Sequence, residues 1–213
     1  IYTFNITDRV DKLRDHALRA IEAGANGLMI NTWTVGLDAA RMLTSDPDIN
    51  VPILSHPDLQ GALCVSDYSG MSVSLANAKF PRIAGLDMAI ILSPYGKFPF
   101  NMDAFVQDSF AMLTPWKHIK PMMPMPGGGT TQGHVAELYN KFGKDIIIAA
   151  GGGVIGHPSG AVAGGKAFRQ AIDATVKGIP LADAAQDPAN EELRVAVEAW
   201  GIYGDAKKLF DLR

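Results

Sequence analysis

Cysteine and surplus positive charge are both scarce in this chain of 213 residues. Cys64 is the single cysteine, so no internal disulfide framework exists, and the composition fits a reducing cytoplasm. We interpret Cys64 as a buried apolar residue rather than a nucleophile. A formal net charge of −3 gives no basic surface, which argues against nucleic acid or an anionic membrane as a partner. No apolar run reaches the roughly 18 residues of a membrane span, and no signal-peptide pattern is present, so the expected location is the cytoplasm.

Several catalytic signatures are missing as well. No G-x-G-x-x-G turn follows the first expected strand, which argues against a dinucleotide-binding doubly wound sheet. No tight carboxylate cluster stands at a strand end as a metal site would require. Neither a Ser-His-Asp set nor a Cys-His pair is apparent. The residues taken alone therefore define no reaction.

The chain does contain a regular alternation of short apolar strands with helices. Such strands have no solvent-facing side and belong in a parallel sheet or barrel covered by helices, so the predicted class is α/β. An open doubly wound sheet and a (β/α)8 barrel that lacks two strands both explain the alternation. Strands are predicted at 2–6, 28–31, 51–56, 87–92, 119–126 and 145–150, and helices at 8–23, 37–43, 72–84, 102–113, 132–142, 163–177 and 191–200.

The ends of the expected elements carry boundary signals. Asp8 is placed to cap the first helix, and Gly24 to stop it. Residues 1–180 are expected to form the barrel part, and 181–213 a helical extension packed outside the sheet. The chain starts on an apolar strand without an initiator methionine, so we expect further residues upstream of Ile1.

Two glycine triplets end neighbouring strands on either side of one expected helix. Gly127–Gly129 follows the first of these strands and Gly151–Gly153 follows the second. Glycines directly after a strand bare backbone N–H groups and let an anion approach them. A (β/α) barrel holds phosphate in this way after its last two strands. The alternative is a pair of tight turns that need positive φ; the spacing favours a phosphate site and a barrel.

Polar residues at the other strand ends are candidates for substrate contacts, because barrels carry their reactive groups there. His56 is a candidate for proton transfer or carbonyl polarisation, or else a structural histidine. Lys97 lies in a loop with glycine and proline, as in water-excluding lids, or else is a solvated surface lysine. His157 is expected to shape a helix start. The neutral candidates are Asn5, Thr7, Asn31, Thr32, Ser93 and Tyr95.

Five segments of the chain resemble the ribulose-bisphosphate carboxylase (RuBisCO) large-chain family, and most closely its RuBisCO-like branch. The resemblance implies a (β/α)8 barrel of RuBisCO type, of which this chain covers strands three to eight and the C-terminal helices. It extends over essentially the whole chain. The segments are Ile147-Ile-Ala-Ala-Gly-Gly-Gly-Val-Ile-Gly-His-Pro-Ser-Gly160, Gly164-Gly-Lys-Ala-Phe-Arg169, Asn31-Thr-Trp-Thr-Val-Gly-Leu-Asp38, Pro52-Ile-Leu-Ser-His-Pro57 and Ser93-Pro-Tyr-Gly96.

The resemblance implies a role for individual residues. Gly128 and Gly129, together with Gly151 and Gly152, match the family's phosphate-binding glycines. His56 matches its strand-five histidine, and Lys97 matches the lid lysine of true carboxylases. Gly127 stands where a serine is usual, so one hydroxyl contact is lost.

Other positions depart from the carboxylases. Pro57 and Leu92 replace an arginine and a histidine that grip the second phosphate of the carboxylase substrate, and Gln60 replaces another histidine. Each charge-assisted bond lost is worth roughly 1.5–3 kcal/mol, so two such losses weaken binding by about two to four orders of magnitude. Fixation of CO₂ on a bisphosphate is therefore disfavoured.

The function that the resemblance implies is Mg²⁺-assisted enolisation or tautomerisation of a small substrate with one phosphate. The expected type is 2,3-diketo-5-methylthiopentyl 1-phosphate of methionine salvage. The family's metal ligands and N-terminal domain have no match here, so the Mg²⁺ ligands are expected upstream of Ile1, in a homodimer. The alternatives are an isomerase or decarboxylase of another sugar monophosphate, a true carboxylase, and a non-catalytic phosphate-binding barrel fragment.

Overall fold

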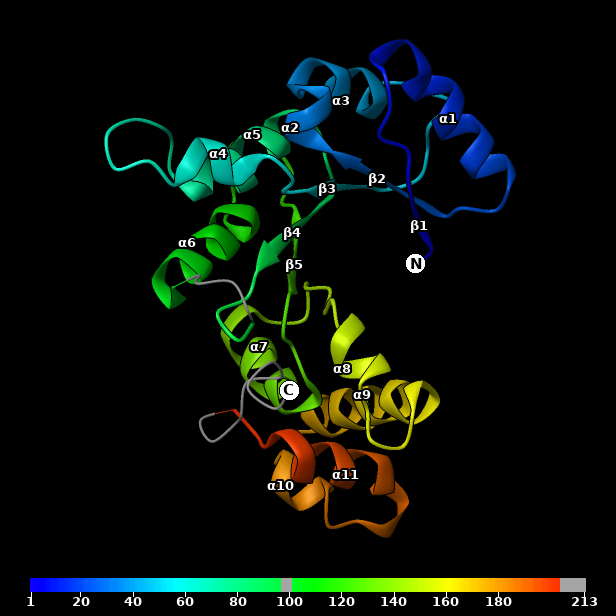
Figure 1. Ribbon diagram of the computed structural model, residues 1–213, viewed down its shortest axis with the longest axis vertical. Coiled ribbons are helices and arrows are strands. Elements are labelled where there is room, and N and C mark those ends of the chain that lie inside the picture. The colour runs from blue at the N-terminus through cyan, green and yellow to red at the C-terminus, as the bar shows by residue number, and fades with distance from the viewer. Residues whose placement is uncertain (97–100, 204–213) are drawn as a thin grey trace. The chain divides into compact units, whose positions relative to one another are not determined.

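The computed structural model describes residues 1–96 and 101–203, and the chain divides into two compact units (Figure 1). Among the described residues, the first unit holds 1–91 and 103–125, and the second holds the remainder. The alternation of strand and helix that the sequence predicts is present, and the α/β class is confirmed.

A five-stranded sheet has its strands in chain order, from β1 to β5. The first three pairings are parallel, with Met29 opposite Leu54 and Leu54 opposite Met88. Leu54 and Met88 are almost completely buried, as expected for strands covered by helices. The strands are β1 (Thr3–Asn5), β2 (Gly27–Asn31), β3 (Ile53–His56), β4 (Met88–Leu92) and β5 (Met123–Gly127), and the last residues of β4 and β5 fall in the second unit.

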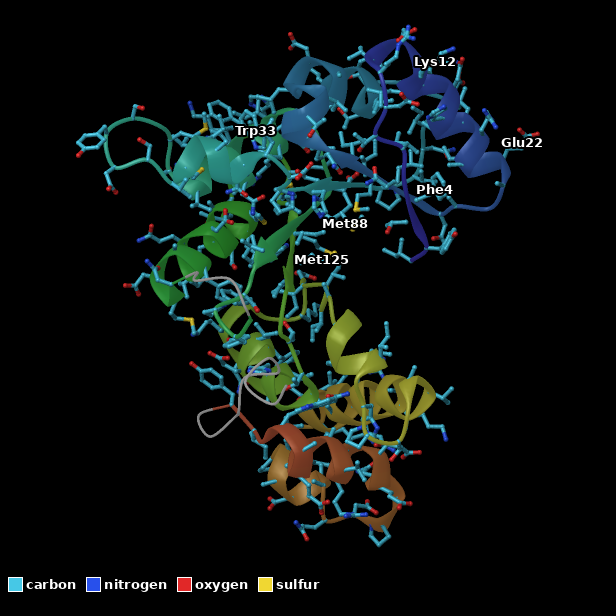
Figure 2. All side chains as sticks on the ribbon, viewed as in Figure 1. Phe4, Lys12, Glu22, Trp33, Met88 and Met125 are labelled. Carbon is cyan, nitrogen blue, oxygen red and sulfur yellow. The ribbon has the colours of Figure 1, made fainter. Side chains whose placement is uncertain are left out.

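Helices of the first unit bury one apolar face each. Helix α1 buries Leu13, Ala17 and Ala20, while its exposed Lys12 and Glu22 project into solvent (Figure 2). This spacing of three and four residues is the amphipathic pattern that predicted the helix. The helical elements of this unit are α1 (Val10–Glu22), α2 (Thr32–Val35), α3 (Leu37–Thr44), α4 (Gln60–Cys64), the π-helix η1 (Ser74–Lys79), α5 (Phe80–Ile83) and α6 (Met102–Leu113), of which Met102 belongs to the second unit.

The two boundary predictions for the first helix have opposite outcomes. Gly24 follows the helix with φ of 102°, a conformation that glycine adopts without strain, so the predicted stop is confirmed. The prediction that Asp8 caps the helix is wrong. The helix starts at Val10, with Arg9 at the capping position. Asp8 accepts from the N–H of Arg9 at 2.7 Å and lies 3.4 Å from Nδ1 of His16, so it caps no N–H of the first turn. Asp8 lies one residue too early to reach the free N–H groups of the first turn.

The second unit is built on the long helix α9. Phe168, Ala171 and Ala174 of this helix share a core with Val135 and Leu193, so the C-terminal helices pack on it. The helical elements are η2 (Gln132–His134), α7 (Val135–Phe142), α8 (Gly151–Ile155), α9 (Ala161–Val176), α10 (Leu181–Ala184), η3 (Pro188–Asn190) and α11 (Glu191–Trp200).

The sixth predicted strand, 145–150, is reduced to one parallel bridge between Gly127 and Ala149. Its neighbour β5 explains this, because alternate residues of a strand face opposite neighbours. Gly127 accepts from the N–H of Ser93, while the carbonyl of Pro126 accepts from the N–H of Ala149 at 2.9 Å. Pro124 and Pro126 thus face residues 145–150, and prolines have no N–H to donate. The hydrogen bonds that β5 would donate to residues 145–150 in a regular parallel ladder are therefore missing at these two positions.

The predicted helix over 72–84 is irregular. Its first part is the π-helix η1, which ends at Lys79, and only the last turn is α-helical. Among the described residues, no helix combines the length and apolar character needed to cross a membrane.

Candidate functional site

The first glycine triplet forms a turn whose shape requires glycine. Gly128 and Gly129 have φ of 85° and 101°, which side-chain-bearing residues rarely adopt. The N–H of Gly129 donates no hydrogen bond to another described residue, whereas the parallel bridge between Gly127 and Ala149 directs the N–H of Gly128 toward the carbonyl of Ala149. Gly96 packs directly on this turn: a Cβ added to Gly96 would lie 1.8 Å from the carbonyl oxygen of Gly128. The turn therefore presents the N–H of Gly129 as a donor that no described residue uses.

The second triplet is the first turn of helix α8 rather than a loop after a strand. Helix geometry leaves the N–H groups of Gly151, Gly152 and Gly153 without intrahelical acceptors. The start of α8 is held by Gln132, whose Nε2 donates to the carbonyl oxygens of Gly153 and Gly164 at 3.1 Å each. A Cβ on Gly153 would lie 2.7 Å from the carbonyl of Thr130, so the two triplets are close within one unit.

Polar atoms without partners border these turns. Thr130 Oγ1 and Gln132 Oε1 are buried, and neither forms a hydrogen bond with any described residue. Buried polar atoms without partners are uncommon in folded proteins. The surroundings of both triplets thus have hydrogen-bonding capacity that the described residues leave unused.

The ends of β1 and β2 carry a polar hydrogen-bonded cluster. Thr7 Oγ1 donates to Asn5 Oδ1 at 2.6 Å, and Asn5 Nδ2 donates to Asn31 Oδ1 at 3.2 Å. Asn31 Nδ2 donates to Asp58 Oδ2 at 3.1 Å, and Thr34 Oγ1 lies 3.5 Å from the same oxygen. We call these five residues the strand-end cluster. No Lys or Arg among the described residues pairs with Asp58.

His56 ends β3 directly opposite Asn31 in the parallel register. The ring is half-buried, and its Nδ1 is buried without a partner in the described part of the chain. Beneath it, Thr32 Oγ1 and Ser55 Oγ form a buried hydrogen bond of 2.6 Å. The candidates Asn5, Thr7, Asn31 and His56 are thus brought together, whereas Thr32 is committed to the core.

Ser93 and Tyr95 belong to the second unit. Ser93 is buried, and its hydroxyl donates to the carbonyl of Gly128 at 2.7 Å. The ring of Tyr95 stacks on His134 with 4.1 Å between centroids, and its hydroxyl donates to Glu137. Burial, reinforced by Glu137, raises the pKa of Tyr95, and burial lowers the pKa of His134 to about 4. Lys97 lies outside the described residues.

The remaining candidates have structural surroundings. His157 is buried, with Nε2 3.0 Å from the carbonyl of Glu192 and with Nδ1 accepting from the N–H of Ser159 at 3.1 Å. The ring thus joins Ser159, just before α9, to Glu192 in the first turn of α11. Cys64 is half-buried, and burial raises the pKa of its thiol, which makes it a poor nucleophile.

The sequence-based selection missed Asp58 and Glu137. Asp58 lies two residues after His56, where no motif marks it, and Glu137 lies on a helix that the pattern assigns only to packing. Across residues 1–96 and 101–203, no three His, Cys, Asp or Glu side chains come together as a metal site. Mg²⁺ requires several oxygen ligands, so these residues alone do not fit a Mg²⁺ site.

Comparison with known proteins places this geometry in a family. Residues 1–200 match the family model described as "Ribulose bisphosphate carboxylase large chain, catalytic domain". The 2,3-diketo-5-methylthiopentyl-1-phosphate enolase of Exiguobacterium sibiricum is 44% identical over 95% of this chain and 50% of its own length. A ribulose bisphosphate carboxylase-like protein of Archaeoglobus fulgidus is 43% identical over 84% of this chain and 41% of its own length. The chain spans about half the length of the curated relatives it matches.

Solved structures agree with the sequence relatives. A rubisco-like protein from Alicyclobacillus acidocaldarius superimposes with a TM-score of 0.87 and 40% identity, over 94% of this chain and 50% of that one. The octameric ribulose-1,5-bisphosphate carboxylase/oxygenase of Pyrococcus horikoshii superimposes with a TM-score of 0.83 and 33% sequence identity, over 92% of this chain and 47% of that one. The predicted membership and the RuBisCO-type fold are both confirmed.

Proposed function

This chain belongs to the ribulose bisphosphate carboxylase large-chain family, and from that membership we propose that its protein is a RuBisCO-like enolase of a sugar-derived monophosphate. The proposed substrate type is 2,3-diketo-5-methylthiopentyl 1-phosphate. Relatives that carry this name are 38–44% identical to most of the chain, which supports the proposal.

The observation that carries the proposal is a difference in charge between two groups of residues. The turn at Gly128 and Gly129 presents a backbone donor, the N–H of Gly129, that suits a phosphate. The strand-end cluster offers amides, hydroxyls and the carboxylate of Asp58, which no cation neutralises within the described residues. A carboxylate repels a phosphate, so the cluster suits carbonyl or hydroxyl groups instead of a second phosphate. This chemistry favours a monophosphate over a bisphosphate.

We assign the roles of individual residues accordingly. Gly128, Gly129, Gly151 and Gly152 form the phosphate-binding turns, with the N–H groups of Gly129, Gly151 and Gly152 as donors. Asn31 provides hydrogen bonds to the substrate, Ser93 supports the phosphate site through its bond to the carbonyl of Gly128, and His56 transfers a proton or polarises a carbonyl. Lys97, outside the described residues, contacts the phosphate or the negative charge that develops on enolisation.

Mg²⁺ completes the proposal as the metal that the family resemblance implies. The described residues supply no ligand set for it. The family resemblance implies that its ligands lie upstream of Ile1. A homodimer in the cytoplasm is the proposed assembly. Solved relatives include a dimeric archaeal enzyme from Hyperthermus butylicus, which covers 94% of this chain.

An isomerase or decarboxylase of another sugar monophosphate is the second candidate. Asp58 favours it, because a carboxylate accepts hydrogen bonds from sugar hydroxyls. Gly127 favours it as well, since it provides no side-chain contact where the family usually has serine.

The native protein is assayed with 2,3-diketo-5-methylthiopentyl 1-phosphate, with and without Mg²⁺, by following the absorbance of the enol. We expect Mg²⁺-dependent enol formation, and a large loss of kcat/KM with the dephosphorylated analogue because the glycine turns then have no anion to bind. No enol formation would refute the substrate, and equal kcat/KM for both compounds would refute the phosphate site. Isomerised or decarboxylated products from a sugar monophosphate would favour the second candidate.

A further inference from the structure

One residue, Ser93, holds two consecutive carbonyl groups of the first glycine turn. Its backbone N–H donates to the carbonyl of Gly127 at 2.8 Å, and its hydroxyl donates to the carbonyl of Gly128 at 2.7 Å. Ser93 is only 1% exposed, so water does not compete for these bonds. Both carbonyls are therefore directed toward Ser93.

Because the peptide bond is planar and trans, the direction of each carbonyl fixes the direction of the N–H group in the same peptide unit. In each peptide unit the N–H points opposite to the C=O. With the oxygens of Gly127 and Gly128 directed at Ser93, the N–H groups of Gly128 and Gly129 are directed away from it. The parallel bridge between Gly127 and Ala149 takes the N–H of Gly128 toward the carbonyl of Ala149, so the N–H of Gly129 is the donor of this turn that an anion can use. The positive φ of both glycines, 85° and 101°, allows this arrangement.

The segment that carries Ser93 also contacts the residues that follow the turn, through Tyr95. Tyr95 stacks on His134, whose Nδ1 accepts from the N–H of Thr131 at 3.0 Å. The Tyr95 hydroxyl donates to Glu137, and the other carboxylate oxygen of Glu137 accepts from Lys141 at 3.1 Å. Thr131 closely follows the glycines in the chain. These contacts therefore link the segment that carries Ser93 to the residues that follow the turn.

From this arrangement we propose that Ser93 is a positioning residue for the phosphate-binding turn, and that the Tyr95–Glu137 pair holds Ser93 in place. Ser93 acts through the direction of the Gly129 N–H group rather than by touching the phosphate. The proposal rests on the proposed phosphate site and assigns to it three side chains that orient a backbone donor.

The primary test is the Ser93→Ala variant of the native protein, titrated with inorganic phosphate in a calorimeter. The substitution removes the bond to Gly128 and keeps the backbone bond to Gly127. Loss of one hydrogen bond corresponds to roughly 2- to 12-fold weaker phosphate binding. Ser69→Ala, at an exposed serine of the first unit, is the matched control and keeps wild-type affinity. In substrate assays Ser93→Ala raises KM with kcat unchanged, because the phosphate contact is equal in the ground and transition states.

The role of the hydrogen bond between Tyr95 and Glu137 is tested by removing it and by restoring an acceptor. Tyr95→Phe and Glu137→Leu each weaken phosphate binding several-fold, whereas Glu137→Gln keeps an acceptor for Tyr95 and stays within about twofold of wild type. If the hydrogen bond between Tyr95 and Glu137 carries the effect of both substitutions, the double variant Tyr95→Phe/Glu137→Leu is no weaker than the worse single variant.

A spectroscopic readout separates positioning from stability. In protein labelled with ¹⁵N-glycine, inorganic phosphate shifts the amide signal of Gly129, and Ser93→Ala reduces this shift. Wild-type phosphate binding that Ser93→Ala leaves unchanged would overturn the positioning role alone. Absence of phosphate binding to the wild-type protein would overturn the phosphate site, and both proposals with it.

Discussion

Asp108 of helix α6 is a buried carboxyl group with a single partner, and its replacement by asparagine has a predictable pH dependence. The side chain is fully buried. Asn77 Nδ2 donates to its Oδ2 at 2.8 Å and also to the carbonyl of Ile90 at 3.0 Å. Oδ1 has no partner among the described residues. Burial therefore raises the pKa of Asp108 to about 7, and the bond from Asn77 offsets only part of this rise.

The raised pKa sets the sign and size of the effect. Between pH 4 and pH 7 an unfolded chain has lost the Asp108 proton, while the folded protein retains it. The unfolded state is therefore favoured as the pH rises, and the contribution levels off above pH 7. A rise in the pKa of Asp108 from 3.8 to about 7 lowers the free energy of unfolding above pH 7 by roughly 4 kcal/mol, at about 1.4 kcal/mol for each pKa unit. The asparagine side chain of the variant stays neutral throughout and removes this loss.

The assay is urea unfolding of wild type and Asp108→Asn from pH 4.5 to pH 8. Asparagine keeps the acceptor for Asn77, so the two proteins have similar stability at pH 4.5. The variant gains stability relative to wild type as the pH rises, by roughly 3–4 kcal/mol at pH 8. Asp103→Asn, an exposed position on the same helix, is the control and gives a difference below about 1 kcal/mol. A stability difference for Asp108→Asn that is independent of pH would refute the reasoning.

Other buried groups give three further predictions. Arg82→Met destabilises the protein by roughly 3–5 kcal/mol in urea unfolding, because the buried guanidinium donates to four carbonyls within residues 111–120; a loss below about 1 kcal/mol would contradict this. Gly96→Ala lowers phosphate affinity more than tenfold by calorimetry, since its Cβ would overlap the carbonyl of Gly128; wild-type affinity would contradict the packing. His134 stays neutral in NMR titrations down to about pH 5, because burial lowers its pKa to about 4 and its protonation favours unfolding; titration near pH 6.5 would contradict its burial.

The sequence predicts the regular elements of this fold well because their periodicity is local. The expected helices at 102–113 and 191–200 coincide with α6 and α11. The strand expected at 145–150 fails for a reason that lies in another segment, since the prolines of β5 remove its hydrogen-bond donors. A pattern within 145–150 cannot reveal what its neighbour lacks.

The candidate site is predictable to a similar extent. The glycine triplets are conspicuous in the sequence, and their proximity follows from the alternation of strand and helix. That the second triplet starts a helix depends on tertiary contacts such as those of Gln132, which carry no local signal. Asn31 bonds Asp58 from 27 residues away in the sequence, and Tyr95 bonds Glu137 from 42 residues away, so no local pattern marks either acid.

The most direct test of the central claim offers the native protein both substrates in the presence of Mg²⁺. With 2,3-diketo-5-methylthiopentyl 1-phosphate we predict enol formation. With ribulose 1,5-bisphosphate and ¹⁴C-labelled CO₂ we predict no acid-stable label, because Pro57 and Leu92 stand where the family resemblance implies the arginine and histidine that hold the second phosphate in carboxylases. Fixed label from the bisphosphate, without enol from the monophosphate, would contradict the account.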